Sequence, residues 1–224
     1  MYNFEKYPFE RLNELLKDIK PNSDYKLSSL TIGEPQFSTP DFIQKELKNT
    51  TELLNKYPKS SGEDFLKEAM RSFISKRFTV KIQNEEIIPT FGTREVLFNF
   101  PQFLLFGKEN AAIAYPNPFY QIYEGAAIAS NAKTIHMDMT KENNFLVSLT
   151  EEQMKDANLV ILNYPSNPTS ATISKQELVK WVENALKYDF VLINDECYSE
   201  LYFDEDTKPV TLLEACVEAG NNDF

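Results

Sequence analysis

Polar residues that could carry chemistry stand directly after two apolar runs of strand length. Asp195 follows the run 190–194, with Tyr198 three residues further on, and Asn167 lies between two prolines after the run 159–163. An ionised carboxylate at the end of a buried strand is costly unless a cation pairs with it. We therefore expect a cationic partner for Asp195, either a basic side chain or a protonated heterocycle. A structural aspartate that caps the next turn is the alternative, and Asn167 could likewise bond only its own turn.

A third motif, Gly92-Thr93-Arg94, stands between a predicted strand and a predicted helix. Such a turn presents backbone N–H groups and the positive end of a helix dipole, which suit a phosphate. A plain turn glycine is the alternative reading of Gly92. Arg94 is also the basic side chain that could approach Asp195 in space.

The elements that must position these motifs follow from hydrophobic spacing. In the first third of the chain, the spacing predicts helices over 9–19 and 40–55, and Ser61-x-x-Asp64 predicts a capping box that opens a helix to residue 78. Further on, strand-length runs alternate with helical stretches. We expect strands over 86–90, 111–115, 133–137, 159–163 and 190–194, and helices over 93–106, 119–129, 174–188 and 212–219.

This alternation predicts an α/β fold, a mainly parallel sheet with helices on both faces. In such sheets, ligands bind at the carboxyl ends of the strands, where all three motifs stand. A dinucleotide-binding domain is set aside, because no Gly-x-Gly-x-x-Gly occurs among the six glycines.

Composition excludes several other classes of protein. The chain has 224 residues, of which 42% are hydrophobic and 25% charged, as in ordinary globular proteins. A net charge of −11 argues against nucleic acid as a partner. Two cysteines cannot make a disulfide scaffold, so we expect both to be reduced in a cytoplasmic protein. The sequence shows no signal peptide, and no apolar run approaches the roughly 18 residues of a membrane span.

In combination and in this order, the motifs resemble those of the class I/II pyridoxal-phosphate-dependent aminotransferases of fold type I. The resemblance covers essentially the whole chain, but only the amino-terminal half of such an enzyme. Four segments carry it: residues 30–37 resemble the family's GEPxF segment, Tyr57-Pro58 with Gly62 its Y…G segment, 163–169 its NxPxNPTG segment, and 195–198 its DExY segment.

The resemblance implies a role for each motif residue around pyridoxal phosphate. Asp195 would pair with the pyridine nitrogen through a charge-assisted bond of roughly 1.5–3 kcal/mol and keep the ring protonated as an electron sink. Asn167 and Tyr198 would bond the phenolic oxygen of the ring, and Tyr120 would stack on its face.

The remaining implied roles concern the phosphate, the substrate and a second subunit. Gly92, Thr93 and Arg94 would cradle the phosphate. Tyr57 would reach it across the interface of a homodimer, and Gly33 would border the substrate carboxylate. The implied substrates are an amino acid and a 2-oxo acid, and no metal is implied. Residues 1–40 would form an N-terminal arm and small-domain segment, and 41–224 the large cofactor-binding domain.

The sequence departs from the family pattern in two places. Ser170 replaces a glycine, which should be tolerated unless the position needs a positive φ. The lysine that forms the Schiff base in the family is expected roughly a dozen residues beyond Phe224. Lys175 lies in a similar segment, but it precedes Asp195, and Ser174 is better explained as a helix cap. We therefore expect a fragment with an exposed sheet edge and without transaminase activity of its own.

Two further functions stay open. A C–S lyase of the same fold would share the cofactor residues, and a non-catalytic remnant or interaction module would keep the fold without the nucleophile. Within the aminotransferases, residues 95–98 and 120–125 look most like the N-succinyl-diaminopimelate aminotransferase subgroup.

Overall fold

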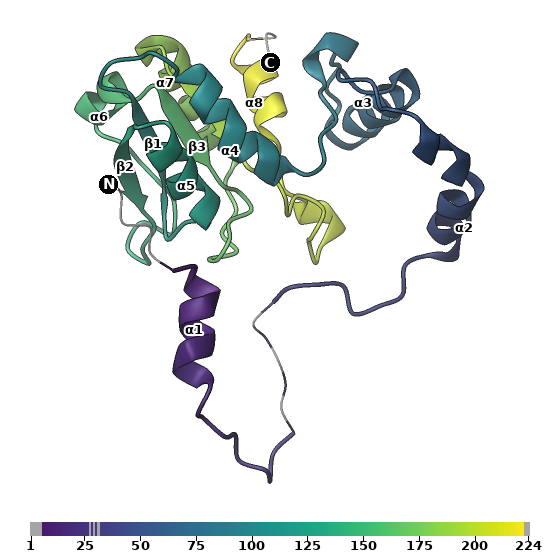
Figure 1. Ribbon diagram of the computed structural model, residues 1–224. Coiled ribbons are helices and arrows are strands. Elements are labelled where there is room, and N and C mark those ends of the chain that lie inside the picture. The colour runs from purple at the N-terminus through teal and green to yellow at the C-terminus, as the bar shows by residue number, and fades with distance from the viewer. Residues whose placement is uncertain (1–5, 27, 29, 31, 222–224) are drawn as a thin grey trace. The chain divides into compact units, whose positions relative to one another are not determined.

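The computed structural model describes residues 6–26, 28, 30 and 32–221, which form two compact units, Met1–Tyr57 and Pro58–Phe224 (Figure 1). Thr31 of the GEPxF-like segment and Phe224 lie outside the described residues. The first unit holds helices α1 (Pro8–Leu16) and α2 (Asp41–Asn49) and a 3-10 turn, η1 (Thr51–Asn55). None of its described residues is buried, so this unit has no core of its own.

The helix predicted over 40–55 is interrupted at Thr50. The hydroxyl of Thr50 donates to the carbonyl of Glu46 at 2.9 Å, and that of Thr51 donates to the carbonyl of Lys48 at 3.2 Å. Threonine hydroxyls that bond backbone carbonyls in this way compete with the regular helical ladder, and here the chain continues as the 3-10 turn η1.

The second unit is built on a four-stranded sheet in which every pair of strands is parallel (Figure 1). Its strands are β1 (Ala112–Asn117), β2 (Lys133–Asp138), β3 (Leu159–Leu162) and β4 (Val191–Asn194), in the order β2-β1-β3-β4. The α/β fold with a parallel sheet is thus confirmed. The chain moves from β1 to β2 on one side and then crosses to β3 on the other. This reversal opens a crevice at the carboxyl ends of β1 and β3.

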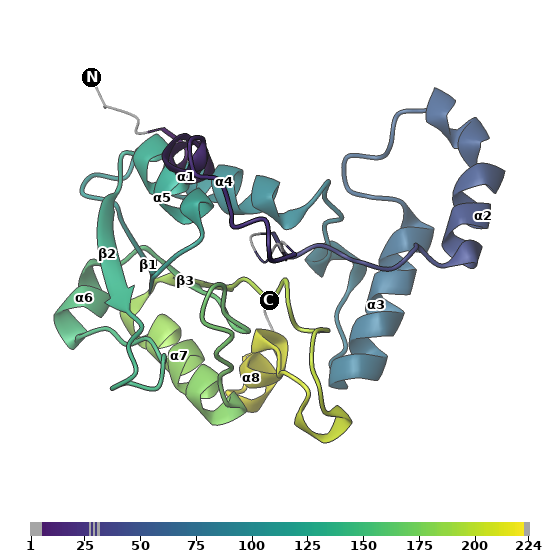
Figure 2. The same ribbon diagram turned by 90° about the horizontal axis from the view of Figure 1, so that it is seen from below.

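Helices cover both faces of this sheet. Helices α4 (Thr93–Leu104) and α5 (Gln121–Ala129) lie on one face, and α7 (Lys175–Tyr188) and α8 (Leu212–Glu218) on the other (Figure 2). The remaining elements are α3 (Asp64–Phe78), α6 (Glu151–Asp156) and the 3-10 turns η2 (Asn84–Glu86) and η3 (Glu205–Thr207).

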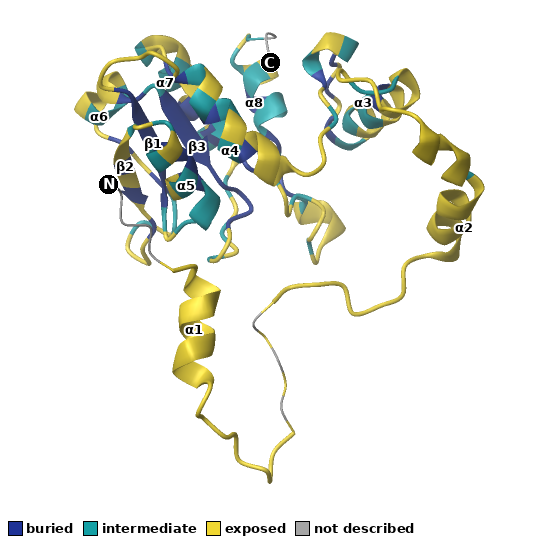
Figure 3. Cartoon of the chain, in the orientation of Figure 1, coloured by how far each residue is buried: buried dark blue, intermediate teal, exposed yellow. Residues whose placement is uncertain are grey.

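Alternation along the strands explains the two-sided core. In β1, Ala112 and Ala114 pack with the α7 and α8 side, whereas Ile113 and Tyr115 pack with the α4 and α5 side. A strand buried on both faces must be apolar throughout, and β1 and β3 form the dark blue centre of the fold in Figure 3. A third, smaller cluster joins α3 to the segment that follows it through Phe78, Val80, Ile82 and Ile87.

Three expected details are wrong. Residues 86–90 form no strand: Asn84–Glu86 is a 3-10 turn, Pro89 has no N–H to donate, and no described strand pairs with this segment. The capping box at Ser61 is absent, because α3 begins after Glu63 and has no side-chain cap. The strand at 190–194 is not fully buried: β4 is the edge of the sheet, and Val191 is 36% exposed.

Side-chain caps begin two further helices, α7 and α6. The Ser174 hydroxyl accepts the Glu177 N–H at 3.2 Å and caps α7, as expected. Helix α6 was not predicted, although Thr150 and Gln153 form a capping box that opens it. No helix in the described part of the chain is long and apolar enough to cross a bilayer.

Two leucines of α7 test this account of the core. Leu178 is fully buried, so we expect Leu178→Ala to lower the free energy of unfolding by about 2–5 kcal/mol. Leu186 on the same helix is 59% exposed, and Leu186→Ala should cost about 0.5 kcal/mol or less. Urea denaturation followed by the fluorescence of Trp181, the single tryptophan, measures both. Equal losses would contradict the assigned core.

Candidate functional site

The crevice at the strand ends contains a cavity of about 200 Å³. Six residues predicted from the sequence line it: Thr93, Arg94, Tyr120, Asn167, Asp195 and Tyr198. Four residues that were not predicted complete the lining: Leu97, Tyr123, Asn163 and Cys197. The first residue of α4, the turns after β1 and β3, and the end of β4 therefore meet at one place.

Three predicted residues do not line the cavity. Gly92 is the N-cap of α4, directly before Thr93. Gly33 and Tyr57 belong to the first unit, where Tyr57 is fully exposed and a side chain at Gly33 would touch nothing within 4 Å. Their roles toward the phosphate and the substrate stay predictions.

Asp195 is the polar centre of the cavity floor. It is only 7% exposed, and its N–H donates to the carbonyl of Leu162 at 2.9 Å, which carries the β3–β4 pairing one residue further. Its Oδ2 accepts the hydroxyl of Tyr123 at 2.7 Å, and its Oδ1 accepts the thiol of Cys197 at 3.0 Å. Each carboxylate oxygen thus has one neutral donor, and the side chain is fixed at the floor.

The two donors stay protonated for physical reasons. Burial, together with the neighbouring Asp195 charge, raises the pKa of Tyr123. Burial and the hydrogen bond to Asp195 also raise the pKa of the Cys197 thiol. The Cys197 sulfur lies 3.4 Å from the hydroxyl of Thr93, so it connects the Asp195 end of the cavity with the start of α4.

Two asparagines hold the strand ends together beneath the cavity. Asn163 Nδ2 donates to the carbonyl of Asp195 at 2.8 Å, and its Oδ1 accepts the Asn167 N–H at 2.8 Å. Asn194 bonds both the N–H and the carbonyl of Tyr164, at 3.1 and 3.2 Å. The turn that carries Asn167 is therefore tied to the strand end that carries Asp195.

Glu196 attaches α8 to the same strand end. Its Oε1 accepts the Leu212 N–H at 2.8 Å and Asn194 Nδ2 at 2.9 Å. Burial raises the pKa of this carboxyl, and its hydrogen bonds only partly oppose that shift. Glu196 was not singled out in the sequence, and its contacts give it a structural role.

The start of α4 contains the three residues that the sequence predicted as a phosphate cradle, and that role stays a prediction. Gly92 has φ +113°, a conformation that favours glycine although a Cβ would meet no neighbour there. Thr93 and Arg94 begin the helix and line the cavity, so its positive dipole end adjoins this space. Arg94 Nε donates to the hydroxyl of Tyr120, which places a guanidinium and an aromatic ring side by side.

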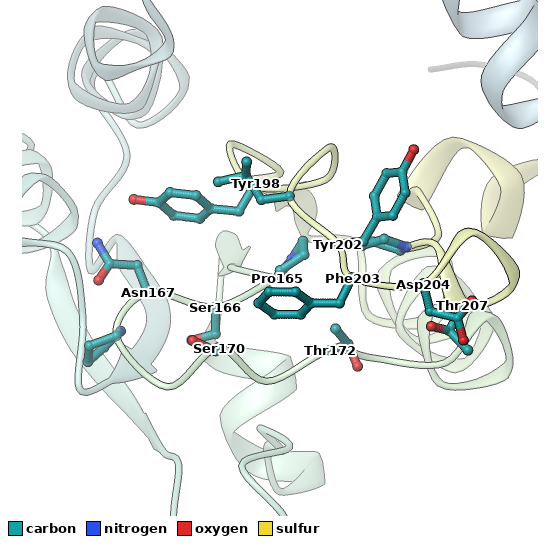
Figure 4. A pocket seen from close by; sticks show the side chains of 13 residues that line it. Pro165, Ser166, Asn167, Ser170, Thr172, Tyr198, Tyr202, Phe203, Asp204 and Thr207 are labelled. Atoms are coloured by element: carbon teal, nitrogen blue, oxygen red, sulfur yellow. The ribbon is translucent and has the colours of Figure 1, made fainter. Parts of the chain in front are cut away.

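Asn167 and Tyr198 stand between this cavity and a larger hollow of about 720 Å³. Figure 4 shows the Tyr198 hydroxyl and the Asn167 amide on the same side of that hollow, with Phe203 further along it. Leu201 and Phe203 contribute strongly exposed apolar side chains to the lining of the larger hollow.

The structure shows the backbone conformation of Ser170 and the surroundings of Lys175, the two positions that bear on the departures from the family pattern. Ser170 has φ +59°, so the position does require the left-handed region that glycine tolerates best. Lys175 does not line the cavity: it is the first residue of α7, and its Nζ lies 2.9 Å from Glu218. Both side chains are partly exposed, so Lys175 and Glu218 form a surface ion pair.

The residues missed in the sequence had weak signals. Tyr123 lies in the first turn of α5, three residues after its N-cap, Tyr120. Asn163 ends an apolar run, and Cys197 lies inside the Asp195-x-x-Tyr198 motif. In the described part of the chain, no group of three or more His, Cys, Asp or Glu residues is arranged to hold a metal.

Comparison of the sequence with known proteins identifies aminotransferases as its relatives. A family model described as "Aminotransferase class I and II" matches residues 25–222. Among curated proteins, the LL-diaminopimelate aminotransferase of Desulforudis audaxviator is 30% identical over 220 residues, or 95% of this chain and 55% of that protein. The LL-diaminopimelate aminotransferase of Maridesulfovibrio salexigens is 28% identical over 214 residues, or 93% of this chain and 54% of that protein.

Solved structures agree with these sequence relatives. The aminotransferase AspB of Helicobacter pylori has a TM-score of 0.94 and 56% identity, covering 100% of this chain and 59% of its own. An aminotransferase of Neisseria meningitidis has a TM-score of 0.88 and 33% identity, covering 98% of this chain and 57% of its own. The chain thus spans little more than half the length of these relatives.

The Tyr123–Asp195 contact can be measured by a double-mutant cycle. A hydrogen bond to a charged group contributes about 1.5–3 kcal/mol, so Tyr123→Phe should be clearly destabilising. In the Asp195→Ala background the same change should cost at least about 1 kcal/mol less, because the acceptor is already gone. Urea denaturation of the four proteins gives the coupling, and additive losses would show that the two side chains do not interact.

Glu196 predicts a pH dependence of stability. Its pKa is raised in the folded protein, so its contribution is fully present below the unfolded value of about 4.3 and is lost as pH rises through the folded pKa. Glu196→Gln keeps an acceptor without the charge. Its stability relative to wild type should therefore improve between pH 4 and 7, by up to about 1.4 kcal/mol for each unit by which the pKa is raised.

Urea denaturation across this pH range checks the result. Glu183→Gln, which removes a charge from an exposed position on α7, is the matched control. A relative stability of Glu196→Gln that stays constant or declines with rising pH would contradict the account of Glu196.

Proposed function

Because the chain belongs to the aminotransferase class I and II family, we propose that its cavity holds pyridoxal phosphate and that the protein serves the transfer of an amino group between an amino acid and a 2-oxo acid. The observation that carries the proposal is the position of Asp195. This buried carboxylate lies on the floor of one cavity that Asn167, Tyr198 and Thr93 also line.

The donor set fits this cofactor. The two partners of the Asp195 carboxylate, Tyr123 and Cys197, are neutral, so they leave its negative charge for a protonated ring nitrogen to balance. Thr93, Arg94 and the positive end of α4 provide donors for a phosphate. One cavity therefore offers a carboxylate for a cationic ring and donors for an anionic tail.

The remaining side chains would orient the ring. Asn167 and Tyr198 would hold its phenolic oxygen, and Tyr120 would cover one face. When bound, the cofactor supplies an electron-withdrawing ring that stabilises negative charge on the substrate Cα. Asp195 would sustain that property by keeping the ring nitrogen protonated, and Tyr123 and Cys197 would keep Asp195 oriented.

We further propose the assembly that the sequence predicts. Residues 1–40 would form an arm and small-domain segment, and 41–224 the cofactor-binding domain. In a homodimer, Tyr57 would reach the phosphate of the other subunit and Gly33 would border the substrate carboxylate. Both residues lie in the first unit.

Residues 1–224 alone should not catalyse turnover. None of the residues that line the cavity is a lysine, and Lys175 is engaged with Glu218. Residues 95–98 and 120–125 resemble the N-succinyl-diaminopimelate aminotransferase subgroup, whereas the curated relatives are named LL-diaminopimelate aminotransferases. Both names refer to diaminopimelate compounds, and we propose this class as the first donors to assay. Release of ammonia in place of amino transfer would favour the lyase reading.

Cofactor binding can be tested without turnover. Pyridoxamine phosphate cannot form imines with surface lysines, so its fluorescence reports binding to the cavity alone. We expect Asp195→Ala to weaken binding roughly tenfold or more, as loss of a charge-assisted bond predicts. Asp206→Ala, at an exposed position outside the cavity, should bind as wild type does.

A second readout uses the wild-type chain and its two thiols. Cys197 lines the cavity, whereas Cys216 packs against the core on the other face of the sheet. Pyridoxamine phosphate should therefore slow the alkylation of Cys197 but leave that of Cys216 unchanged, as mass spectrometry of the labelled peptides can measure. No protection of Cys197 at saturating ligand would overturn the proposed site.

A further inference from the structure

The larger hollow of about 720 Å³ adjoins the cofactor cavity, because Asn167 and Tyr198 line both. A volume of this size is typical of sites for small molecules. Figure 4 shows these two residues at one end of the larger hollow and Asp204 and Thr207 at the other, with Phe203 between the two ends. A molecule that begins at Asn167 can therefore extend along the hollow towards Asp204.

Asp204 is the one charged residue among those that line the larger hollow. It is exposed, and its Oδ1 accepts the Asp206 N–H at 3.0 Å at the start of η3. Within the described part of the chain, its Oδ2 has no hydrogen-bond donor and the carboxylate takes part in no ion pair. A cationic group in the hollow would therefore meet a carboxylate that no basic side chain of the described residues already occupies.

The basic side chains nearest to this end already have acidic partners. Lys208 lies over the ring of Tyr202, with Nζ 5.1 Å from the ring centroid, and the same Nζ lies 2.5 Å from Glu205. Arg77 donates to Glu200 at 2.9 Å. Segment 200–208 contains four acidic residues and one basic residue, so the field at this end of the hollow favours a cation.

The walls of the larger hollow suit a flexible chain with a cationic end. Aromatic rings and prolines make up much of the lining, and Phe203 is fully exposed. Apolar walls of this kind cover methylene groups, and the faces of aromatic rings attract ammonium groups. The hollow thus combines an apolar passage with a carboxylate at its far end.

The position of the cofactor connects this hollow with the reaction. In pyridoxal phosphate, the carbon that receives the amino group is attached to the ring next to the phenolic oxygen, which Asn167 and Tyr198 would hold. We propose that the larger hollow is the subsite for the distal part of the amino donor, and that Asp204 binds a second, cationic amino group there. This inference rests on the proposed function and deepens it by naming the class of donor.

The same features separate the two diaminopimelate compounds. LL-diaminopimelate carries a free distal ammonium group, whereas in the N-succinyl compound that nitrogen is an uncharged amide and a further carboxylate is added. None of the residues that line the hollow is lysine, arginine or histidine, so the added carboxylate would find no basic partner in the lining. The subsite therefore favours a donor with a free second amino group.

The test uses stable reduced conjugates, in which a secondary amine joins the pyridoxyl phosphate ring to the amino acid. Such conjugates bind without a Schiff-base lysine and carry the cofactor and the donor in one molecule. The conjugate of LL-diaminopimelate is compared with that of L-2-aminopimelate, which differs only in lacking the distal amino group. We expect the first to bind about three- to tenfold more tightly, by fluorescence titration, and the difference to shrink at high salt. Equal affinities for the wild-type chain would overturn the proposal.

Matched variants locate the distal contact. Asp204→Asn removes the charge but keeps a side-chain oxygen for the Asp206 N–H, so it should bind both conjugates alike. Asp206→Asn makes the same chemical change two residues further on, at an exposed position outside the lining, and should retain the wild-type preference. A preference that survives in Asp204→Asn, or that both variants lose equally, would contradict the assignment to Asp204.

Two further ligands complete the comparison. The conjugate of N-succinyl-diaminopimelate should bind more weakly than that of LL-diaminopimelate, and the reverse order would overturn the proposed donor class. Pyridoxamine phosphate has no distal part, so Asp204→Asn should leave its affinity unchanged. If pyridoxamine phosphate binds and depends on Asp195 while the conjugates show no preference, only the subsite is wrong. If neither pyridoxamine phosphate nor the conjugates bind, the proposed function fails and this inference fails with it.

Discussion

The site depends on one buried carboxylate, that of Asp195, which accepts hydrogen bonds from two neutral side chains. Asp195 lies at the end of β4, and its two oxygens accept a phenol and a thiol, both of which remain neutral. Neutral donors fix the orientation of a carboxylate but leave its charge in place. Everything else at the strand ends serves this arrangement: Asn163 holds the main chain of Asp195, and the same asparagine holds the turn of Asn167. The strand ends bring Asn163, Asn167 and Asp195 together, and their side chains make this part of the cavity polar.

Polarity and spacing in the sequence indicated several of the residues that line the cavity, and the family resemblance added others such as Tyr120. Asp195, Asn167 and Thr93 were recognisable because each follows an apolar run, and parallel strands bring their carboxyl ends to one edge. Tyr123 and Asn163 were not, because a tyrosine in a helix and an asparagine at a strand end usually serve packing or a turn. Their function depends on contacts 72 and 32 residues away in the sequence, and local patterns cannot report such contacts.

The sequence predicted the strands that are buried in the core. It failed where strand formation depends on a neighbouring strand. β1 and β3 are apolar on both faces, so their burial could be read from composition. Residues 86–90 contain two adjacent isoleucines, yet Pro89 and the absence of a described neighbouring strand leave them unpaired. The sequence identified Ser170 as a replacement for glycine, but only the backbone shows that its φ of +59° makes the replacement a strained one.

Thr93, Leu97, Asp195 and Cys197 line both the cofactor cavity and a groove of about 920 Å³ along β4. Any molecule seated in the groove therefore shares four lining residues with any ligand in the cavity. Thermodynamic linkage then requires reciprocity: if an occupant of the groove steadies these residues and raises the affinity of the cavity for its ligand by some factor, the ligand raises the affinity of the groove for that occupant by the same factor. Filling of the groove and filling of the cavity would then be coupled events.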